Sequence, residues 1–399
     1  MSELRYPHYI EWMLHHGLVS MISLAILLGI KTSMADPAPL TLEPGAHVII
    51  LGNGLGSRMQ RHGYLETEIL RRYPAHRLVL RNMADEGNTP GFRPHSGRPS
   101  PYAFPGADAF APPLSESKDR WGSGHTGLGT YPTPDEWLER LHADVILAFF
   151  GYNESFNGAE GLERFQAELN AWVLHTRSKI YNQKSPAQLV LISPLAFEDL
   201  STTHHTPDGR RENAHLALYT GAMEAVAREH DLLFVNLFTP SQQWFNQHPT
   251  PLTLDGFQLI EKGQQILAEH LAQALLGPPV SEEMDLQTLR AAVVEKNWMW
   301  HKLYKIPNGV HVFGRRHRPF GPDNYPHEQI KLQELTGNRD QAIWAVLEGR
   351  DFDLSQADLQ THTLPAIETN YRPGGQIGAA KYLYGEEAIQ SMTLAKGFH

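Results

Sequence analysis

The first residues that could take part in binding or catalysis lie in a glycine-rich turn that follows an apolar strand, HVIILGNGLGSRMQRHG at 47–63. In α/β proteins such a turn is where a phosphate or a nucleophilic side chain is held. Asn53, Gly54 and Ser57 occupy this turn. Their residue types fit neither use cleanly, so the turn indicates an active site, a cofactor site or the remnant of one.

Three further segments place polar residues or glycine next to apolar runs. MADEGNTP supplies Gly87 after a second strand, and FFGYNES supplies Asn153 and Glu154 after a third. PLTLDGFQLIEKGQQILAEHL supplies Asp255 and Gln258 just before a last helix. In open α/β sheets the ends of the strands are where ligands bind.

The elements that position these residues follow from the hydrophobic pattern. From residue 46, short apolar runs alternate with longer amphipathic segments, which predicts an α/β fold: a three-layer α/β/α sandwich with a five-stranded parallel sheet. Near-continuous apolar runs suit strands that are buried on both faces. The expected strands are 47–53, 77–83, 144–153, 188–197 and 232–238. The expected helices are 57–72, 159–181, 211–230 and 259–276.

Two regions break this rhythm. The connection 84–133 is long and rich in glycine, proline and aromatic residues, which favours a lid or a substrate-binding surface over plain disorder. The segments 289–306 and 324–351 read as helices, and we expect a helical C-terminal extension packed on the domain. The expected division is 1–35 signal peptide, 36–278 main domain, 279–351 extension and 352–399 tail or linker.

The N-terminus indicates export. GLVSMISLAILLGI at 17–30 has the length of a signal-peptide apolar region, and small residues favour cleavage after Ala35. A buried helix of the fold is the alternative. The run is too short to span a bilayer, so no stable membrane insertion is expected after cleavage. The chain has no cysteine, hence no disulfide and no lipidation site. The expected location is therefore the periplasm or the medium.

The charge balance limits the partners. A net charge of −10 at pH 7 argues against nucleic acid as a main partner, because phosphate binding needs a positive surface. A small-molecule or glycan ester ligand is the expected partner.

Taken together, the segments ending in LGNGLGS, FFGYNES and LDGFQ, with Gly87, resemble the blocks of the SGNH hydrolases, also called the GDSL lipase/acylhydrolase family. The resemblance covers residues 46–276. It implies a flavodoxin-like fold, no metal or organic cofactor, and hydrolysis of carboxylic esters, with acyl or acetyl groups on carbohydrate or lipid. It also implies that Gly87 and Asn153 are oxyanion donors and that Asp255 orients a histidine base.

Two positions depart from that family. Gly54 stands where the nucleophilic serine belongs, after Asn53 in place of aspartate, and Gln258 stands at the base. Glycine has no nucleophile, and glutamine has no useful basicity near neutral pH. Ser57 is a possible substitute nucleophile or a helix-capping serine. Glu154 is a possible base or a structural substitute for the family's aspartate.

Histidines in loops are the other possible participants. None has metal-ligand spacing, and each is read first as a surface residue. They are His125, His204, His205 and His248.

Two rival functions stay open. One is a catalytically degenerate SGNH fold that binds a glycan through Trp121, Tyr102 and Tyr131 without cleaving it. The other is a dinucleotide site, since GNGLGS approximates G-x-G-x-x-G. The second strand ends in Arg-Asn-Met at 81–83, however, where that site needs an acidic residue.

The extension carries its own resemblance. WMWHKLYKIPNG and NRDQAIWAVLEGRD are similar to the region that follows an SGNH domain in certain large exported bacterial proteins. The closing GEEAIQSMTLAKGF is similar to the lead-in to further domains in such proteins. The resemblance implies further domains in a larger parent protein.

Overall fold

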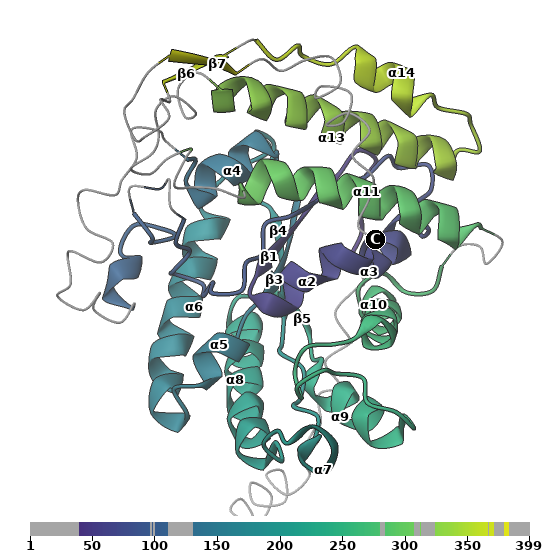
Figure 1. Ribbon diagram of the computed structural model, residues 1–399. Helices are drawn as coiled ribbons and strands as arrows, with labels where there is room; N and C mark the ends of the chain where they lie inside the picture. The colour runs from purple at the N-terminus through teal and green to yellow at the C-terminus, as the bar shows by residue number, and fades with distance from the viewer. Residues whose placement is uncertain are drawn as a thin grey trace, which may run out of the picture. The chain divides into compact units, whose positions relative to one another are not determined.

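Five parallel strands form the central sheet in the computed structural model, in the order β2-β1-β3-β4-β5 (Figure 1). The five strands predicted from the apolar runs are confirmed. They are β1 His47–Gly52, β2 Val79–Asn82, β3 Val145–Phe149, β4 Gln188–Ile192 and β5 Leu233–Val235. The structure describes residues 40–95, 98, 100–110, 131–279, 284–306, 312, 324–365, 367–370 and 379–382. The signal-peptide range and the end of the tail lie outside these residues.

The strand order makes a switch point at β1. In register, Val48 lies opposite Leu80 of β2 on one side and Val145 of β3 on the other. The chain therefore leaves β1 in one direction and later returns to its other side. In such sheets the usual ligand site is the crevice at the carboxyl ends of the two strands whose connections diverge. Asn53 directly follows β1, and Asn153 lies four residues after the end of β3.

Helices cover both faces of the sheet, which confirms the three-layer prediction (Figure 1). Alternate β1 residues enter different cores: Ile49 and Leu51 pack with α6 and α8, whereas Val48 and Ile50 pack with α2, α3 and α10. This alternation is the period of a strand that is buried on both faces. The helices are α2 Gly54–His62, α3 Tyr64–Leu70, α6 Leu162–Arg177, α8 Arg210–Glu229 and α10 Glu261–Leu276.

Local details differ from the expected helices. One helix was expected over 57–72, but Gly63 ends α2 in the left-handed region at φ +69° and donates its N–H to Met59 O, so α3 starts afresh. Several short helices were not predicted, because their sequences show no clear apolar spacing. They are η1 Ala107–Ala109, α4 Pro134–Arg140, α5 Tyr152–Ser155, η2 Ala159–Gly161, α7 Ser201–His204 and α9 Phe238–Gln247.

The first part of the long connection is packed against α6. The Glu168 carboxylate accepts hydrogen bonds from Gly91 N and Thr89 Oγ1, both at 2.7 Å. Phe104 and Ala107 are buried in the core on that side of the sheet. Residues 111–130 of the expected lid lie outside the described part of the chain. The described part of this connection is therefore packed against α6 and held there by hydrogen bonds and buried apolar side chains.

The helical C-terminal extension is confirmed, and it packs on the sheet domain. It contains α11 Leu286–Lys305, α13 Tyr325–Leu347 and α14 Leu354–Leu359, followed by an antiparallel pair, β6 Ile367–Asn370 and β7 Ala379–Tyr382. Helix α11 contacts α2, α3, β2 and α13. The domain boundaries expected from the sequence stay predictions.

The extension supplies partners for the outer edge of the sheet. Strand β2 is an edge strand, so its outward backbone groups have no neighbouring strand to pair with. Here two carbonyl oxygens of β2 and one on either side of it accept hydrogen bonds from side chains of α11 and α13. The donors are Trp344 Nε1 to Leu78 O (3.0 Å), Lys296 Nζ to Leu80 O (3.0 Å), Trp300 Nε1 to Asn82 O (2.7 Å) and Tyr304 Oη to Met83 O (3.2 Å).

A test of this edge cover is the substitution Trp300→Phe. We expect it to lower the free energy of unfolding by about 2 kcal/mol, because the buried carbonyl of Asn82 loses its indole donor. Urea denaturation measures the loss. Trp244→Phe is the matched control, since the Trp244 indole donates no hydrogen bond to a described residue. Equal losses in the two variants would contradict the role given to the indole N–H.

Candidate active site

The carboxyl ends of β1, β2 and β3 are tied together by backbone hydrogen bonds. Asn53 N donates to Phe149 O at 3.0 Å, which joins the first turn to the end of β3. Asp85 N donates to Gly52 O at 2.9 Å, which joins the segment after β2 to the end of β1. The three strand ends therefore form one rigid edge at the switch point.

The Asn153 side chain holds the segment that contains Gly87. Its Nδ2 donates to Glu86 O and to Asn88 O, both at 2.9 Å. A side-chain amide has two N–H donors, so both are engaged by the carbonyls on either side of Gly87. Asn153 and Gly87 are thus brought together, but the amide is bonded to the loop and has no proton left for a ligand oxygen.

Gly54 begins α2 with room for a side chain. A Cβ built on it would meet only Glu86 Cγ, at 3.6 Å. Asn53 precedes it as the helix cap, with Oδ1 accepting from Leu55 N at 3.3 Å, and is only 2 % exposed. Its Nδ2 is buried and makes no hydrogen bond to a described residue. The turn is therefore a helix start with space where a serine hydroxyl would stand.

Asp255 stabilises the turn that contains Gln258. Its Oδ1 accepts from Phe257 N at 3.1 Å and from Gln258 N at 2.7 Å. The Phe257 ring stacks on Tyr152 with centroids 3.3 Å apart. Burial and the negative charge of Asp255 raise the pKa of Tyr152 to about 12. The turn is thus joined to the Asn153 helix through Tyr152, while the Gln258 side chain makes no hydrogen bond to a described residue.

Ser57 is not arranged as a substitute nucleophile. It lies inside the first turns of α2 and is 3 % exposed. Its Oγ accepts a hydrogen bond from Lys305 Nζ at 2.9 Å, and the same ammonium group pairs with Asp85 Oδ1 at 2.9 Å. A nucleophilic serine needs a base that takes its proton, whereas this one faces a donor. Ser57 therefore anchors α11 to α2.

Glu154 is placed as a structural residue. Its Oε2 accepts from Gly151 N at 2.8 Å, which caps the start of its own short helix, and the residue is 4 % exposed. Burial raises its pKa to about 8, and Glu168 adds to the shift. Near neutral pH the group is mostly protonated, so it does not supply the carboxylate base considered from the sequence.

The other candidates from the sequence are dispersed. His204, the last residue of α7, has its Nδ1 2.8 Å from Thr203 Oγ1. His248, just after α9, has its Nδ1 2.7 Å from Thr250 O. His205 is exposed at the end of α7. His125 and Trp121 lie outside the described residues.

The expected aromatic platform on the long connection is not formed as predicted. Tyr131 is 2 % exposed, stacks on His95 and donates its hydroxyl to Tyr304 O, so its ring is part of the core. Tyr102 is half-buried against Phe92. A glycan cannot reach the Tyr131 face, because other rings already cover it.

Two residues beside this edge were not anticipated. His301 and Lys305 come from α11, one helical turn apart, and Lys305 reaches Asp85 as described. Burial, together with the positive charges of Lys305 and Lys302, lowers the pKa of His301 to about 4. The sequence shows that His301 and Lys305 lie on one face of a helix. It does not show that this helix packs against α2, because that contact depends on the tertiary structure.

The described residues offer no obvious metal or membrane site. Among them, no three His, Cys, Asp or Glu side chains converge as ligands. Within the same residues, every helix is too short or too polar to cross a bilayer. At the end of β2, where a dinucleotide site needs an acidic residue, Asn82 Nδ2 donates to Gly56 O at 2.7 Å.

Sequence comparison finds no matching protein family and no matching curated protein. Structural comparison finds esterases and lipases. The Geobacillus stearothermophilus acetylxylan esterase Axe2, seen as a catalytic mutant, has a TM-score of 0.40 at 15% identity, covering 61% of this chain and 100% of that one. A putative GDSL-like lipase from Parabacteroides merdae has a TM-score of 0.41 at 15% identity, covering 59% and 98%.

A third similar structure is BT4096, a gut microbial diltiazem-metabolizing enzyme, with a TM-score of 0.41 at 14% identity. The match covers 60% of this chain and 49% of that chain, about half its length. At these identities and scores the similarity establishes no activity. The fold class is shown by the sheet itself, a flavodoxin-like order of five parallel strands between two helix layers.

The space at Gly54 gives a direct prediction. We expect Gly54→Ser to fold with a free energy of unfolding within about 1 kcal/mol of the wild type, because its Cβ meets nothing closer than 3.6 Å. Gly52→Ser is the matched control. There the Cβ would lie 2.0 Å from Phe149 O at φ +122°, so we expect a loss of several kcal/mol or no folded protein. Urea denaturation compares the two, and similar losses would contradict the geometry of this turn.

The protonated state of Glu154 predicts how stability changes with pH. Between about pH 4.5 and 8 the folded protein keeps a proton that the unfolded chain releases, so stability falls as pH rises through this window. The variant Glu154→Gln cannot ionise. We expect the wild type to lose roughly 2 to 4 kcal/mol relative to that variant between pH 5 and pH 8, measured by urea denaturation at each pH. Parallel pH profiles would show that Glu154 is ionised in the folded state.

Proposed function

We propose that this chain is an SGNH-type protein that binds a carbohydrate or ester ligand at the carboxyl edge of its sheet without hydrolysing it. The observation that carries the proposal is the side chain of Asn153. Both of its amide protons are donated to Glu86 O and Asn88 O, so a group that would stabilise an oxyanion is bonded within the loop. One lost oxyanion donor typically costs 10²–10³ in rate.

The missing proton-transfer pair supports the same proposal. Gly54 offers no nucleophile and Gln258 no base. Ser57 faces an ammonium donor, and Glu154 is buried and mostly protonated near neutral pH. Acyl transfer needs a nucleophile, a base and an oxyanion site together. Neither Ser57 as nucleophile nor Glu154 as base replaces the groups that are missing at Gly54 and Gln258.

The proposal includes the setting of the protein. The apolar run at 17–30 and the small residues before Asp36 support export to the periplasm or the medium. The closing GEEAIQSMTLAKGF supports further domains in a larger parent protein. A non-hydrolysing sugar-binding module beside other exported domains would bring them to a glycan surface.

An esterase assay tests the proposal. We expect residues 36–399 to hydrolyse p-nitrophenyl acetate and acetylated xylo-oligosaccharides no faster than a buffer blank, because the nucleophile and base are absent. The double variant Gly54→Ser with Gln258→His restores both, and we expect turnover above that blank. Gly54→Ser alone is the matched control, and we expect it to stay at least about tenfold slower than the double variant because it lacks the base.

Two results would contradict the proposal. Wild-type turnover that disappears in Asn153→Ala would mean a working site with an unconventional nucleophile. A folded double variant without any turnover would mean that Gly54 and Gln258 do not stand at the nucleophile and base positions.

A further inference from the structure

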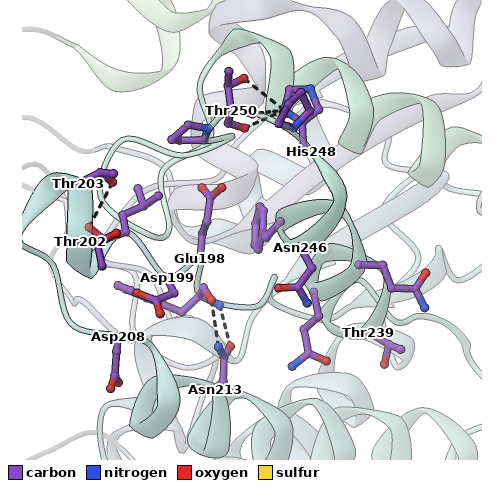
Figure 2. A pocket seen from close by; sticks show the side chains of 17 residues that line it. Glu198, Asp199, Thr202, Thr203, Asp208, Asn213, Thr239, Asn246, His248 and Thr250 are labelled. Atoms are coloured by element: carbon purple, nitrogen blue, oxygen red, sulfur yellow. Dashed lines mark hydrogen bonds between the residues drawn. The ribbon is translucent and has the colours of Figure 1, made fainter.

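A polar cavity of about 610 Å³ lies at the carboxyl ends of β4 and β5, apart from the edge formed by β1, β2 and β3. One wall is the segment 197–208 that follows β4, and the other is α9 with residues 248–251 (Figure 2). Cavities that bind small molecules are typically about 300–1,000 Å³ in size. The catalytic blocks do not line this cavity, so its residues need a separate explanation.

Helix α9 presents uncharged polar groups to the cavity. Gln242, Gln243 and Asn246 line it from one helix face, with Thr239 one turn earlier. The three amides are exposed, and none is engaged by a hydrogen bond to a described residue. Each amide offers two donors and an acceptor. In Figure 2, Asn246 and Thr239 lie across the hollow from Thr202 and Asp208.

The opposite wall is built to be rigid. Asn213 bonds both backbone groups of Phe197, accepting from its N–H at 2.8 Å and donating to its carbonyl at 2.9 Å. The Phe197 ring lies against Gly256, where a Cβ would come within 2.2 Å of it at φ +92°. The buried Glu198 carboxylate accepts from Leu252 N at 3.0 Å. The aromatic ring on this wall therefore has a fixed position.

The charges on this wall are already partnered and negative. Asp199 bonds to Ser201, and this hydrogen bond lowers its pKa; Asp208 bonds to Arg210, with the same effect on its pKa. These carboxylates stay ionised at neutral pH and disfavour an anionic ligand. Arg210, which pairs with Asp208, offsets one of these two charges toward a cationic ligand.

From this combination we infer that the cavity is a binding site for a short neutral saccharide. Amides and hydroxyls on α9 pair with sugar hydroxyls, and the half-buried rings of Phe197 and Phe245 offer apolar faces to the C–H side of a pyranose. This inference rests on the proposed function, in which the protein binds its ligand without cleaving it. It adds where the ligand binds, the cavity beside α9, and its class, a neutral saccharide. It replaces the expected platform at Tyr131, which is buried.

Ligand-observed NMR titrations test the inference on residues 36–399. The probes are cellobiose, xylobiose and N,N′-diacetylchitobiose, with glucose 6-phosphate as the anionic probe and spermidine as the cationic one. We expect at least one neutral disaccharide to bind. Gln242→Ala with Asn246→Ala should raise its Kd by about 10-fold to 100-fold through two lost hydrogen bonds. Gln247→Ala, exposed on the same helix but outside the cavity, is the matched control and should leave Kd unchanged.

The outcomes separate this inference from the proposed function. Binding by none of the three disaccharides, binding that the double variant leaves unchanged, or tighter binding of either charged probe would overturn the inference. Gln243→Ala with Thr239→Val repeats the test on the neighbouring helix positions should the first variant unfold. Wild-type ester hydrolysis with α9-dependent sugar binding would overturn the proposed function alone and make the cavity a substrate subsite.

Discussion

A parallel sheet that ends in β2 leaves a row of backbone groups facing outward, and such groups must be paired when they are buried. In this chain the partners are long side chains on two helices: Lys296, Trp300 and Tyr304 from α11, and Trp344 from α13. Their positions fix the line along which α11 must run. As a consequence the last turn of α11 carries Lys305 to the end of β2, beside the candidate site.

Buried charges make this arrangement specific. Lys296 is fully buried and pairs with Glu66 of α3 at 2.6 Å, and Arg81 of β2 pairs with Asp340 of α13. Removing one partner of such a pair costs several kcal/mol, because the other charge stays buried and unpaired. The direct ion-pair partners of Glu66 and Arg81 therefore come from the extension. In physical terms α11 and α13 belong to the fold, because they cover the outer edge of the sheet.

The sequence predicted the parts of the structure that depend on local patterns. Five apolar runs became five strands, because burial on both faces leaves a continuous apolar signal. The candidate residues after β1, β2 and β3 lie at one edge because parallel strands end together. The direction of the Asn153 amide could not be predicted, since it depends on which carbonyls face it. Nor could the cavity, since Phe197 and α9 are far apart in sequence and meet only through packing.

Asp255, Gly256 and Asn153 each have a structural role in the fold. Asp255 stabilises its turn through two backbone N–H groups, and Gly256 in that turn makes room for Phe197. Asn153 fixes the segment around Gly87. Losing any of these would disturb the backbone, whereas the residue type at position 54 affects only a side chain, because a Cβ there meets nothing closer than Glu86 Cγ at 3.6 Å. The turns at Gly54 and Asp255 are therefore held by backbone contacts that do not depend on a serine or a histidine at positions 54 and 258.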